Sequence, residues 1–169
     1  TLVEWQLVRS ILTGNWLVPG YSHDGKLMTL YQYAQNNERK ILYPTKTLGH
    51  HVLSGNLYDK QKAVLFLCEG VWDAMALWEV LGNCKESGGK YAATGNRGAS
   101  LLSDCNVLAV PSCSVFLESW LPLFAGKVVN LMFDNDHERI HDKTGAAIAP
   151  GALVGMKSVT KVLSEADYP

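Results

Sequence analysis

Two patterns of hydrophobic and polar positions divide the chain near residue 63. Before it, the segments KLMTLYQY (26–33) and KILYPT (40–45) alternate apolar and polar residues as half-buried strands do, with the polar turn AQNNER between them. Asp24-Gly25 is a further turn signal, and the glycine-punctuated stretch LGHHVLSGN follows. We therefore predict a small, mainly antiparallel β subdomain in residues 1–62, although the same pattern also suits the edge of a larger domain.

From Ala63 onward, short apolar runs alternate with amphipathic stretches, which is typical of a parallel sheet covered by helices on both faces. The predicted strands are AVLFLC (63–68), NVLAVP (106–111) and KVVNLMF (127–133). The predicted helices are VWDAMALWEVLG (71–82), VFLESWLPLF (115–124), which Pro122 should end or bend, and residues 150–164. The glycine-rich stretch 86–104 is an expected insertion with one short strand. The fold class is therefore α/β, with the parallel sheet in residues 63–169.

Helical spacing also predicts which side chains face the sheet. In the first helix these are Val71, Met75, Trp78 and Leu81, and in the last helix they are Met156, Val159, Thr160 and Leu163.

Composition narrows the class of protein. The chain has 169 residues, of which 47% are hydrophobic and 18% charged, so an intrinsically disordered protein is excluded. No apolar run reaches the roughly 18 residues that cross a bilayer, and no secretory signal opens the sequence, so we expect a soluble cytoplasmic protein with no membrane partner. The four cysteines form no CxxC pair and are expected to be reduced core thiols.

The charge is unevenly distributed along the chain. Residues 1–62 carry seven Lys or Arg against four Asp or Glu, a balance of +3, whereas residues 63–169 carry eight against twelve, a balance of −4. Proteins that bind DNA strongly on their own present a basic surface, because neutralised phosphates supply most of the affinity. We therefore expect weak DNA binding by this chain alone.

Acidic residues follow two of the predicted strands. Glu69 comes directly after the strand at 63–68, and Asp134 and Asp136 come after the strand at 127–133. In an open parallel sheet, ligands bind beyond the carboxyl ends of the strands, so these carboxylates meet at one edge if the strands are neighbours. Three ionised carboxylates repel one another unless a cation neutralises them, and Mg²⁺ is the natural choice for oxygen ligands. This predicts phosphoryl-transfer chemistry, with Asp73 either a helix-start residue or a support for the metal.

These residues carry a resemblance to a known family. VLFLCEGVWDAMAL (64–77) resembles the first motif of Toprim domains, and KVVNLMFDND (127–136) resembles their strand that ends in an Asp-x-Asp pair. The likeness covers roughly residues 63–164. The preceding strands resemble the small subdomain that comes before Toprim in phage primase-helicases, and residues 106–139 are similar to the later part of phage-type primase Toprim domains.

The resemblance implies a Rossmann-like Toprim fold in which Glu69, Asp134 and Asp136 bind catalytic Mg²⁺ or Mn²⁺. It also implies a DNA primase, a nucleotidyltransferase that joins ribonucleoside triphosphates on a single-stranded DNA template during DNA replication in a bacterial or phage-infected cell. A helicase and a zinc-binding domain, in the same or another chain, are the implied protein partners. In one departure from the family pattern, HERIHDKT lengthens the metal loop before Gly145.

Two other readings of the same motifs remain open. One is a Toprim nuclease or topoisomerase fragment, which would cleave DNA. The other is a catalytically silent Toprim module that serves a replication complex by docking or DNA handling.

Further candidate residues each have a functional and a structural interpretation. TGNRG (94–98) offers backbone amides and Arg97 for a triphosphate, or is an ordinary loop. His137 and His141 suggest a transition-metal site, or are solvated loop residues. The basic residues expected either to follow template phosphates or to form a solvated face are Lys26, Arg39, Lys40 and Lys46. The aromatic residues expected either to stack on bases or to fill the core are Trp5, Trp16, Tyr31 and Tyr33.

Overall fold

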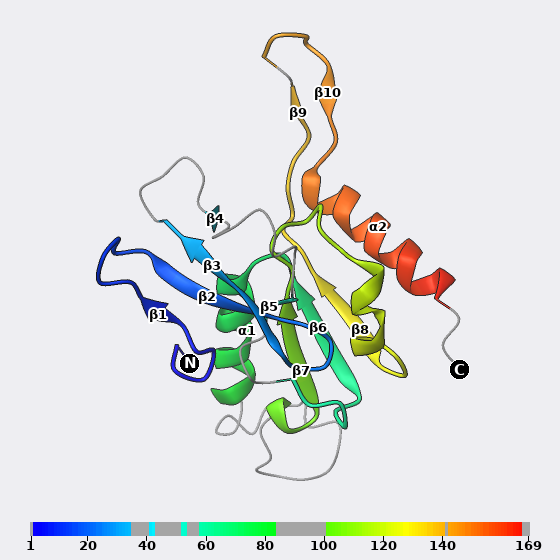
Figure 1. The fold of residues 1–169 in the computed structure, drawn as a ribbon. Coiled ribbons are helices and arrows are strands. Elements are labelled where there is room, and N and C mark those ends of the chain that lie inside the picture. The colour runs from blue at the N-terminus through cyan, green and yellow to red at the C-terminus, as the bar shows by residue number, and fades with distance from the viewer. Residues whose placement is uncertain are drawn as a thin grey trace.

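A computed structural model describes residues 2–34, 41–42, 52–53, 58–83, 101–140 and 142–166 (Figure 1). Its centre is a mixed sheet of eight strands. Seven of them have the order β4-β3-β2-β5-β7-β6-β8, and the eighth, β1, pairs with β2. The strands are β1 (Val8–Arg9), β2 (Trp16–Tyr21), β3 (Leu27–Tyr33), β4 (Ile41–Leu42), β5 (Val52–Leu53), β6 (Val64–Cys68), β7 (Cys105–Ala109) and β8 (Val128–Met132). The helices are α1 (Val71–Asn83) and α2 (Gly151–Glu165), with 3-10 turns η1 (Leu101–Ser103) and η2 (Glu118–Leu123).

The N-terminal strands form the predicted antiparallel arrangement. β2 pairs with β3 from Trp16 opposite Tyr33 to Tyr21 opposite Leu27, and Gly25 closes the turn between them at a φ of 79°. The sequence does not predict β1, which has only two residues, or β2, in which Pro19 and Gly20 interrupt the alternation that identifies a strand. β5 then pairs with β7 through Leu53 and Ala109, which joins the antiparallel and parallel parts in one sheet. The predicted domain boundary between residues 62 and 63 falls between β5 and β6, and it stays a prediction.

The three predicted strands of the second segment are confirmed as a parallel unit. β6 lies between β7 and β8, with Cys68 opposite both Ala109 and Met132. Because the registers match at this end, the carboxyl ends of all three strands lie at the same edge of the sheet. The α/β fold class is therefore confirmed.

Both faces of the parallel strands are covered, as the continuous apolar runs predict. Along β6, Leu65 and Leu67 face one core while Cys68 faces the other. One core joins the N-terminal strands to α1 through Trp5, Leu7, Val18, Tyr31, Cys68, Val71, Ala74, Met75, Trp78, Leu81, Val107 and Ala109. The opposite core lies under η2 and α2 and contains Leu65, Leu67, Leu108, Val110, Trp120, Leu123, Phe124 and Val159.

Three details of the helices differ from the prediction or refine it. The four α1 residues expected to face the sheet are all buried. The helix expected at 115–124 is instead the short 3-10 turn η2, because Pro122 lacks an amide proton; Trp120 and Phe124 donate to carbonyls three residues back. In α2, Val159 is buried as expected, but Thr160 is exposed and Ala152 and Gly155 are buried instead.

A two-stranded arm follows the acidic residues that come after β8. β9 (Arg139–Ile140) pairs antiparallel with β10 (Ala147–Ile148), and this ribbon projects from the body of the molecule before the chain enters α2 (Figure 1). The sequence predicts a long loop here. Strands of two residues are too short to show an alternation of apolar and polar positions. Gly145, at a φ of 65°, lies in the turn between them.

Most of the predicted glycine-rich insertion, residues 86–100, lies outside the described residues; its end forms η1. Within the described ranges, no helix has the length and apolar character needed to cross a membrane.

Candidate active site at the carboxyl ends of the parallel strands

The pairing of β6 with β8 brings Glu69 and Asp134 together, as predicted for neighbouring strands. The Glu69 amide donates to the Met132 carbonyl at 3.3 Å, which extends the strand ladder by one residue. The Asp134 amide then donates to a Glu69 carboxylate oxygen at 3.2 Å. Each residue therefore fixes the position of the other at the same edge of the sheet.

The loop that follows β7 contributes a thiol to this edge. The Cys113 thiol lies near enough to the Glu69 carboxylate for each group to shift the pKa of the other. A Cβ atom added to Gly151 would lie 3.4 Å from Cys113 Sγ and 3.8 Å from Asp136 Oδ2, so the thiol and the second aspartate both approach the first residue of α2. A carboxylate near a helix N-terminus is favoured by the helix dipole. Asp136 is thus placed on the same side of the molecule as Glu69.

Asp73 lies in the first turn of α1, close to the turn that follows β6. A Cβ atom at Gly70 would lie 2.9 Å from Asp73 Oδ2, so the missing side chain at residue 70 lets this carboxylate fold over the backbone. Gly70 also accepts the Ala74 amide at 3.1 Å, the first hydrogen bond of the helix. Asp73 therefore fills a helix-start position and at the same time adds negative charge to the edge.

Burial and mutual repulsion both act on these acids. The pKa of Glu69 is raised, first by burial and then by the charges of Asp134 and Asp136, while the Asp134 amide and the Cys113 thiol oppose the rise. The pKa of Asp73 is raised by burial and by Asp134. A raised carboxyl pKa means that the ionised form is disfavoured, and a nearby cation would reverse this effect.

Cys113 is the site residue that sequence reasoning missed. Cys68 and Cys105 are buried, as expected of core thiols, and burial together with Asp73 raises the pKa of Cys68 to about 12. Cys113 is only partly buried and faces carboxylates. The sequence signal was present, because Cys113 comes two residues after the apolar strand 106–111, and Glu69 comes directly after 63–68. The strand-end rule that selected Glu69 applies equally to Cys113.

The chemistry of the donors suits a hard divalent cation. Glu69, Asp134, Asp136 and Asp73 supply carboxylate oxygens, the ligands that Mg²⁺ and Mn²⁺ prefer. Among the residues that the structure describes, however, no three His, Cys, Asp or Glu side chains form a group that could hold a metal ion. Asp73 and Asp134 are both exposed. The metal site itself stays a prediction.

Most of the other predicted binding residues lie in parts of the chain that the structure does not describe. Lys26 is exposed in the turn between β2 and β3, and Arg39, Lys40, Lys46 and Arg97 lie outside the described residues. His137 is exposed, and its proposed partner His141 is also outside the described part of the chain.

Of the aromatic candidates, Trp5 and Tyr31 belong to the core. Trp16 and Tyr33 are half-buried and pack edge-on against Trp72, at ring-centroid distances of 6.3 and 5.1 Å.

The sequence matches no protein-family model, and no curated protein matches it either. The functional argument therefore rests on the residues of this edge and on their arrangement.

Proposed function

We propose that this protein is a metal-dependent nucleotidyltransferase that acts on nucleic acid, and specifically a DNA primase of the phage type with a Toprim-like domain. One observation carries the proposal: β6 and β8 are adjacent and parallel, so the Glu-Gly turn and the Asp-x-Asp pair lie at one edge of the sheet. The direct contact from the Asp134 amide to the Glu69 carboxylate supports it.

In this proposal, Glu69, Asp134 and Asp136 hold Mg²⁺ or Mn²⁺, and Asp73 supports them. When bound, such an ion polarises a nucleotide phosphate and lowers the pKa of an attacking hydroxyl. The chain's own contribution is to fix Glu69, which the Asp134 amide holds by a hydrogen bond of 3.2 Å. Because burial disfavours the ionised form of Glu69, the site is prepared for a cation rather than for solvent.

Substrate binding is assigned to the basic residues of the chain. Lys26, Arg39, Lys40 and Lys46 contact phosphates of the single-stranded DNA template, and Arg97 contacts the triphosphate of the incoming ribonucleotide. The excess positive charge of residues 1–62 supports this division of labour. Because the net charge of the whole chain is −1, a helicase and a zinc-binding domain supply the remaining template affinity.

The test is incubation of the protein with single-stranded DNA, ribonucleotides and Mg²⁺, followed by sizing of the products. We expect ribo-oligomers. Glu69→Gln and Asp134→Asn should each reduce their yield by more than about 100-fold, beyond what loss of an outer-shell partner costs. Asp142→Asn, an acidic residue of the exposed arm, is the matched control and should keep full activity.

The same reactions distinguish the alternatives. Nicking of DNA that Glu69→Gln abolishes, with no ribo-oligomers, would assign the site to a nuclease or topoisomerase. Absence of both products, also when a helicase and a zinc-binding domain are supplied, would indicate a catalytically silent module.

A further inference from the structure

Three half-buried aromatic side chains from three elements lie in contact beside the acidic edge. We call Trp16, Tyr33 and Trp72 the aromatic cluster. Trp16 at the start of β2 and Tyr33 at the end of β3 are direct cross-strand partners, and both pack edge-on against Trp72, at interplanar angles of 79° and 72°. An edge-on contact covers one face of only one of the two rings. Because all three residues are also partly exposed, the cluster keeps aromatic surface open to solvent.

Trp72 places this cluster next to the candidate active site. It lies in the first turn of α1 and directly precedes Asp73, whose carboxylate folds over the backbone of Gly70. In Figure 1, β3 ends and α1 begins in the upper part of the molecule, where β6 also ends and from which the arm projects. The aromatic cluster and the carboxylates therefore lie on neighbouring parts of one surface.

An exposed cation borders the cluster. Arg9 of β1 is opposite Trp16 in the sheet register, so the two side chains leave the same face of the sheet. Leu7, two residues before Arg9, belongs to the core on this face, which agrees with the register. The Arg9 Nε atom donates to the Gly14 carbonyl at 3.2 Å, which uses one of the five N–H donors of the guanidinium. This bond holds the group at the margin of the cluster and leaves its other donors to an anion.

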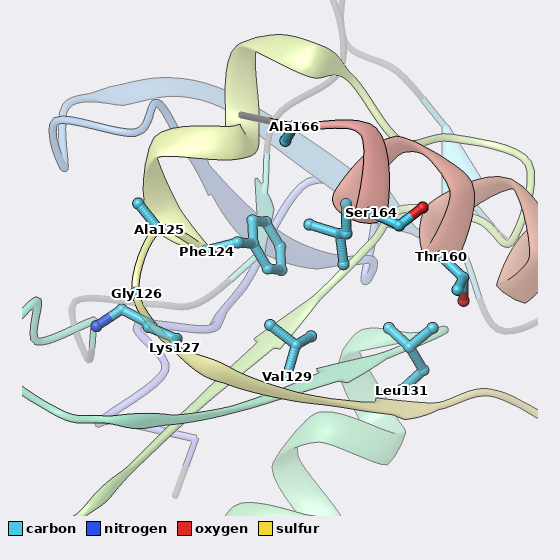
Figure 2. Close-up of a pocket in the computed structure, with 10 residues that line it drawn as sticks. Phe124, Ala125, Gly126, Lys127, Val129, Leu131, Thr160, Ser164 and Ala166 are labelled. Carbon is cyan, nitrogen blue, oxygen red and sulfur yellow. The ribbon is translucent and has the colours of Figure 1, made fainter. Parts of the chain in front are cut away.

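The pocket on the opposite face of the parallel strands has a different chemistry. It has a volume of about 430 Å³ and lies between the end of η2, β8 and α2. Figure 2 shows Phe124, Val129 and Leu131 directed into it. Lys127 also lines this pocket, but its ammonium group donates to two backbone carbonyl oxygens at 2.9 and 2.7 Å. One ring and an engaged cation suit a nucleic-acid strand less well than the aromatic cluster and Arg9 do.

We propose that the aromatic cluster and Arg9 bind single-stranded DNA: an unpaired base stacks on the cluster, and the adjoining phosphate accepts hydrogen bonds from the Arg9 guanidinium. Proteins hold single strands in this way, with rings that stack on bases and cations that follow the backbone. Bases within a duplex are enclosed in its stack, so the ligand is an unpaired strand. The inference rests on the proposed function, in which the acidic edge acts on nucleic acid, and it adds the place where the template is held.

Photo-crosslinking of the wild-type chain tests base stacking in the absence of divalent ions and nucleotides. The probe is a thymidine oligonucleotide of about 16 nucleotides that carries one 5-iododeoxyuridine, whose base couples on irradiation to an aromatic side chain in contact with it. Mass spectrometry should locate the cross-link on Trp16, Tyr33 or Trp72. Cross-links confined to other residues would overturn the proposal. Since no synthesis is needed, this failure is distinct from failure of the proposed function.

Fluorescence anisotropy with the unmodified oligonucleotide measures the contribution of the rings. Tyr33→Leu should weaken binding about 5- to 150-fold, which is the effect of losing one base–aromatic stack, whereas Tyr33→Phe keeps the ring and should bind like wild type. Phe116→Leu is the matched control, because Phe116 is a half-buried ring in edge-on contact with Trp120 and Phe124 in the opposite core. It should leave the affinity unchanged.

The salt dependence of binding measures the contribution of Arg9. Arg9→Gln should reduce the slope of log K against log salt concentration by about 0.7, the value of one phosphate contact on a single strand. Lys157→Gln removes the same charge from an exposed position on α2 and should keep the wild-type slope. Equal weakening by Tyr33→Leu and Phe116→Leu, an unchanged slope in Arg9→Gln, or no binding by wild type at about 1 mM protein would each overturn the proposal.

Discussion

At the scale of single residues, Gly155 determines how closely α2 approaches the candidate site. A Cβ atom at this position would lie 2.2 Å from the Cys113 carbonyl oxygen and 2.9 Å from its carbonyl carbon. These are backbone atoms, which cannot rotate aside as a side chain does. The absence of a side chain at residue 155 therefore lets α2 pack against the loop that carries Cys113.

We predict that Gly155→Ala destabilises the protein. Alanine is favoured over glycine in a helix by up to about 1 kcal/mol, but the overlap with Cys113 requires a backbone shift costing about 1 to 3 kcal/mol. The free energy of unfolding, measured by urea denaturation, should fall by about 1 to 2 kcal/mol. Gly151→Ala is the matched control, because its Cβ atom would make only a 3.4 Å contact with Cys113 Sγ. Equal effects of the two substitutions would contradict this account.

The raised pKa of Glu69 has a consequence for stability. A carboxyl whose pKa is higher in the folded than in the unfolded protein binds protons more readily when folded. Stability therefore decreases as pH rises from the ordinary glutamate value of 4.5 through the folded pKa, and the loss remains at higher pH.

We predict that Glu69→Gln removes this loss. The measured quantity is the melting temperature of the variant minus that of the wild type, in the absence of divalent ions. This difference should be about 1 to 3 °C larger at pH 7 than at pH 4. Calorimetry or thermal circular dichroism at the two pH values measures the difference. A gap that is the same at both pH values would show that ionisation of Glu69 does not oppose folding.

At the scale of elements, the sequence predicts the strands and helices whose apolar pattern is local. It does not predict those that depend on their partners in the folded protein. The strands β6, β7 and β8 were predicted because buried parallel strands read as apolar runs, and α1 because its buried face repeats at helical spacing. β2 was missed because Pro19 and Gly20 break its alternation, and its partners β3 and β5 compensate for this. The arm was missed because two-residue strands carry no period.

The residues of the candidate site also differ in how far the sequence predicts them. Glu69, Asp134 and Asp136 were predictable, since an acid directly after an apolar run marks a strand end. Cys113 is predicted to be a core thiol, because cysteine usually behaves as a small hydrophobe. Only the path of the loop after β7 and the close approach of Gly151 and Gly155 place its thiol beside Glu69.

Asn106 connects β7 to the segment that leads into β6. It is fully buried, its side-chain amide donates to the Asp59 carbonyl at 2.8 Å, and its side-chain oxygen accepts the Asp59 amide at 2.8 Å. These two bonds satisfy the side chain and fix residue 59 against the sheet. Asp59 itself is exposed, and its carbonyl also accepts the Lys62 amide at 3.2 Å.

We predict that Asn106→Ala lowers the free energy of unfolding by about 1 to 3 kcal/mol, because the Asp59 amide loses its partner while the Asp59 carbonyl keeps the Lys62 amide. Urea denaturation measures the loss. Asn130→Ala, on the partly exposed strand β8, should lower it by less than about 1 kcal/mol. A small effect at Asn106 would indicate that water replaces its two hydrogen bonds.

At the scale of the whole molecule, one core joins the N-terminal strands to the helix that begins beside the candidate site. Trp5 is completely buried and packs edge-on against Trp78 of α1, with 6.4 Å between ring centroids. Val18 of β2 and Val107 of β7 belong to the same core. The sheet is also continuous through the pairing of β5 with β7. The antiparallel and parallel parts should therefore unfold together.

Trp5→Ala tests this cooperativity. It removes a large side chain from the shared core at a position far along the chain from the acidic residues. The loss of a buried tryptophan should reduce the free energy of unfolding by about 3 to 5 kcal/mol. If the two parts form one unit, amide hydrogen exchange should accelerate by a similar factor in β2, β3, α1 and β7. Val3→Ala, which changes an 87% exposed side chain of the same segment, should leave exchange unchanged. Faster exchange confined to β1, β2 and β3 would instead show that residues 58–166 are stable on their own. The acidic edge would then not depend on the N-terminal strands for its geometry.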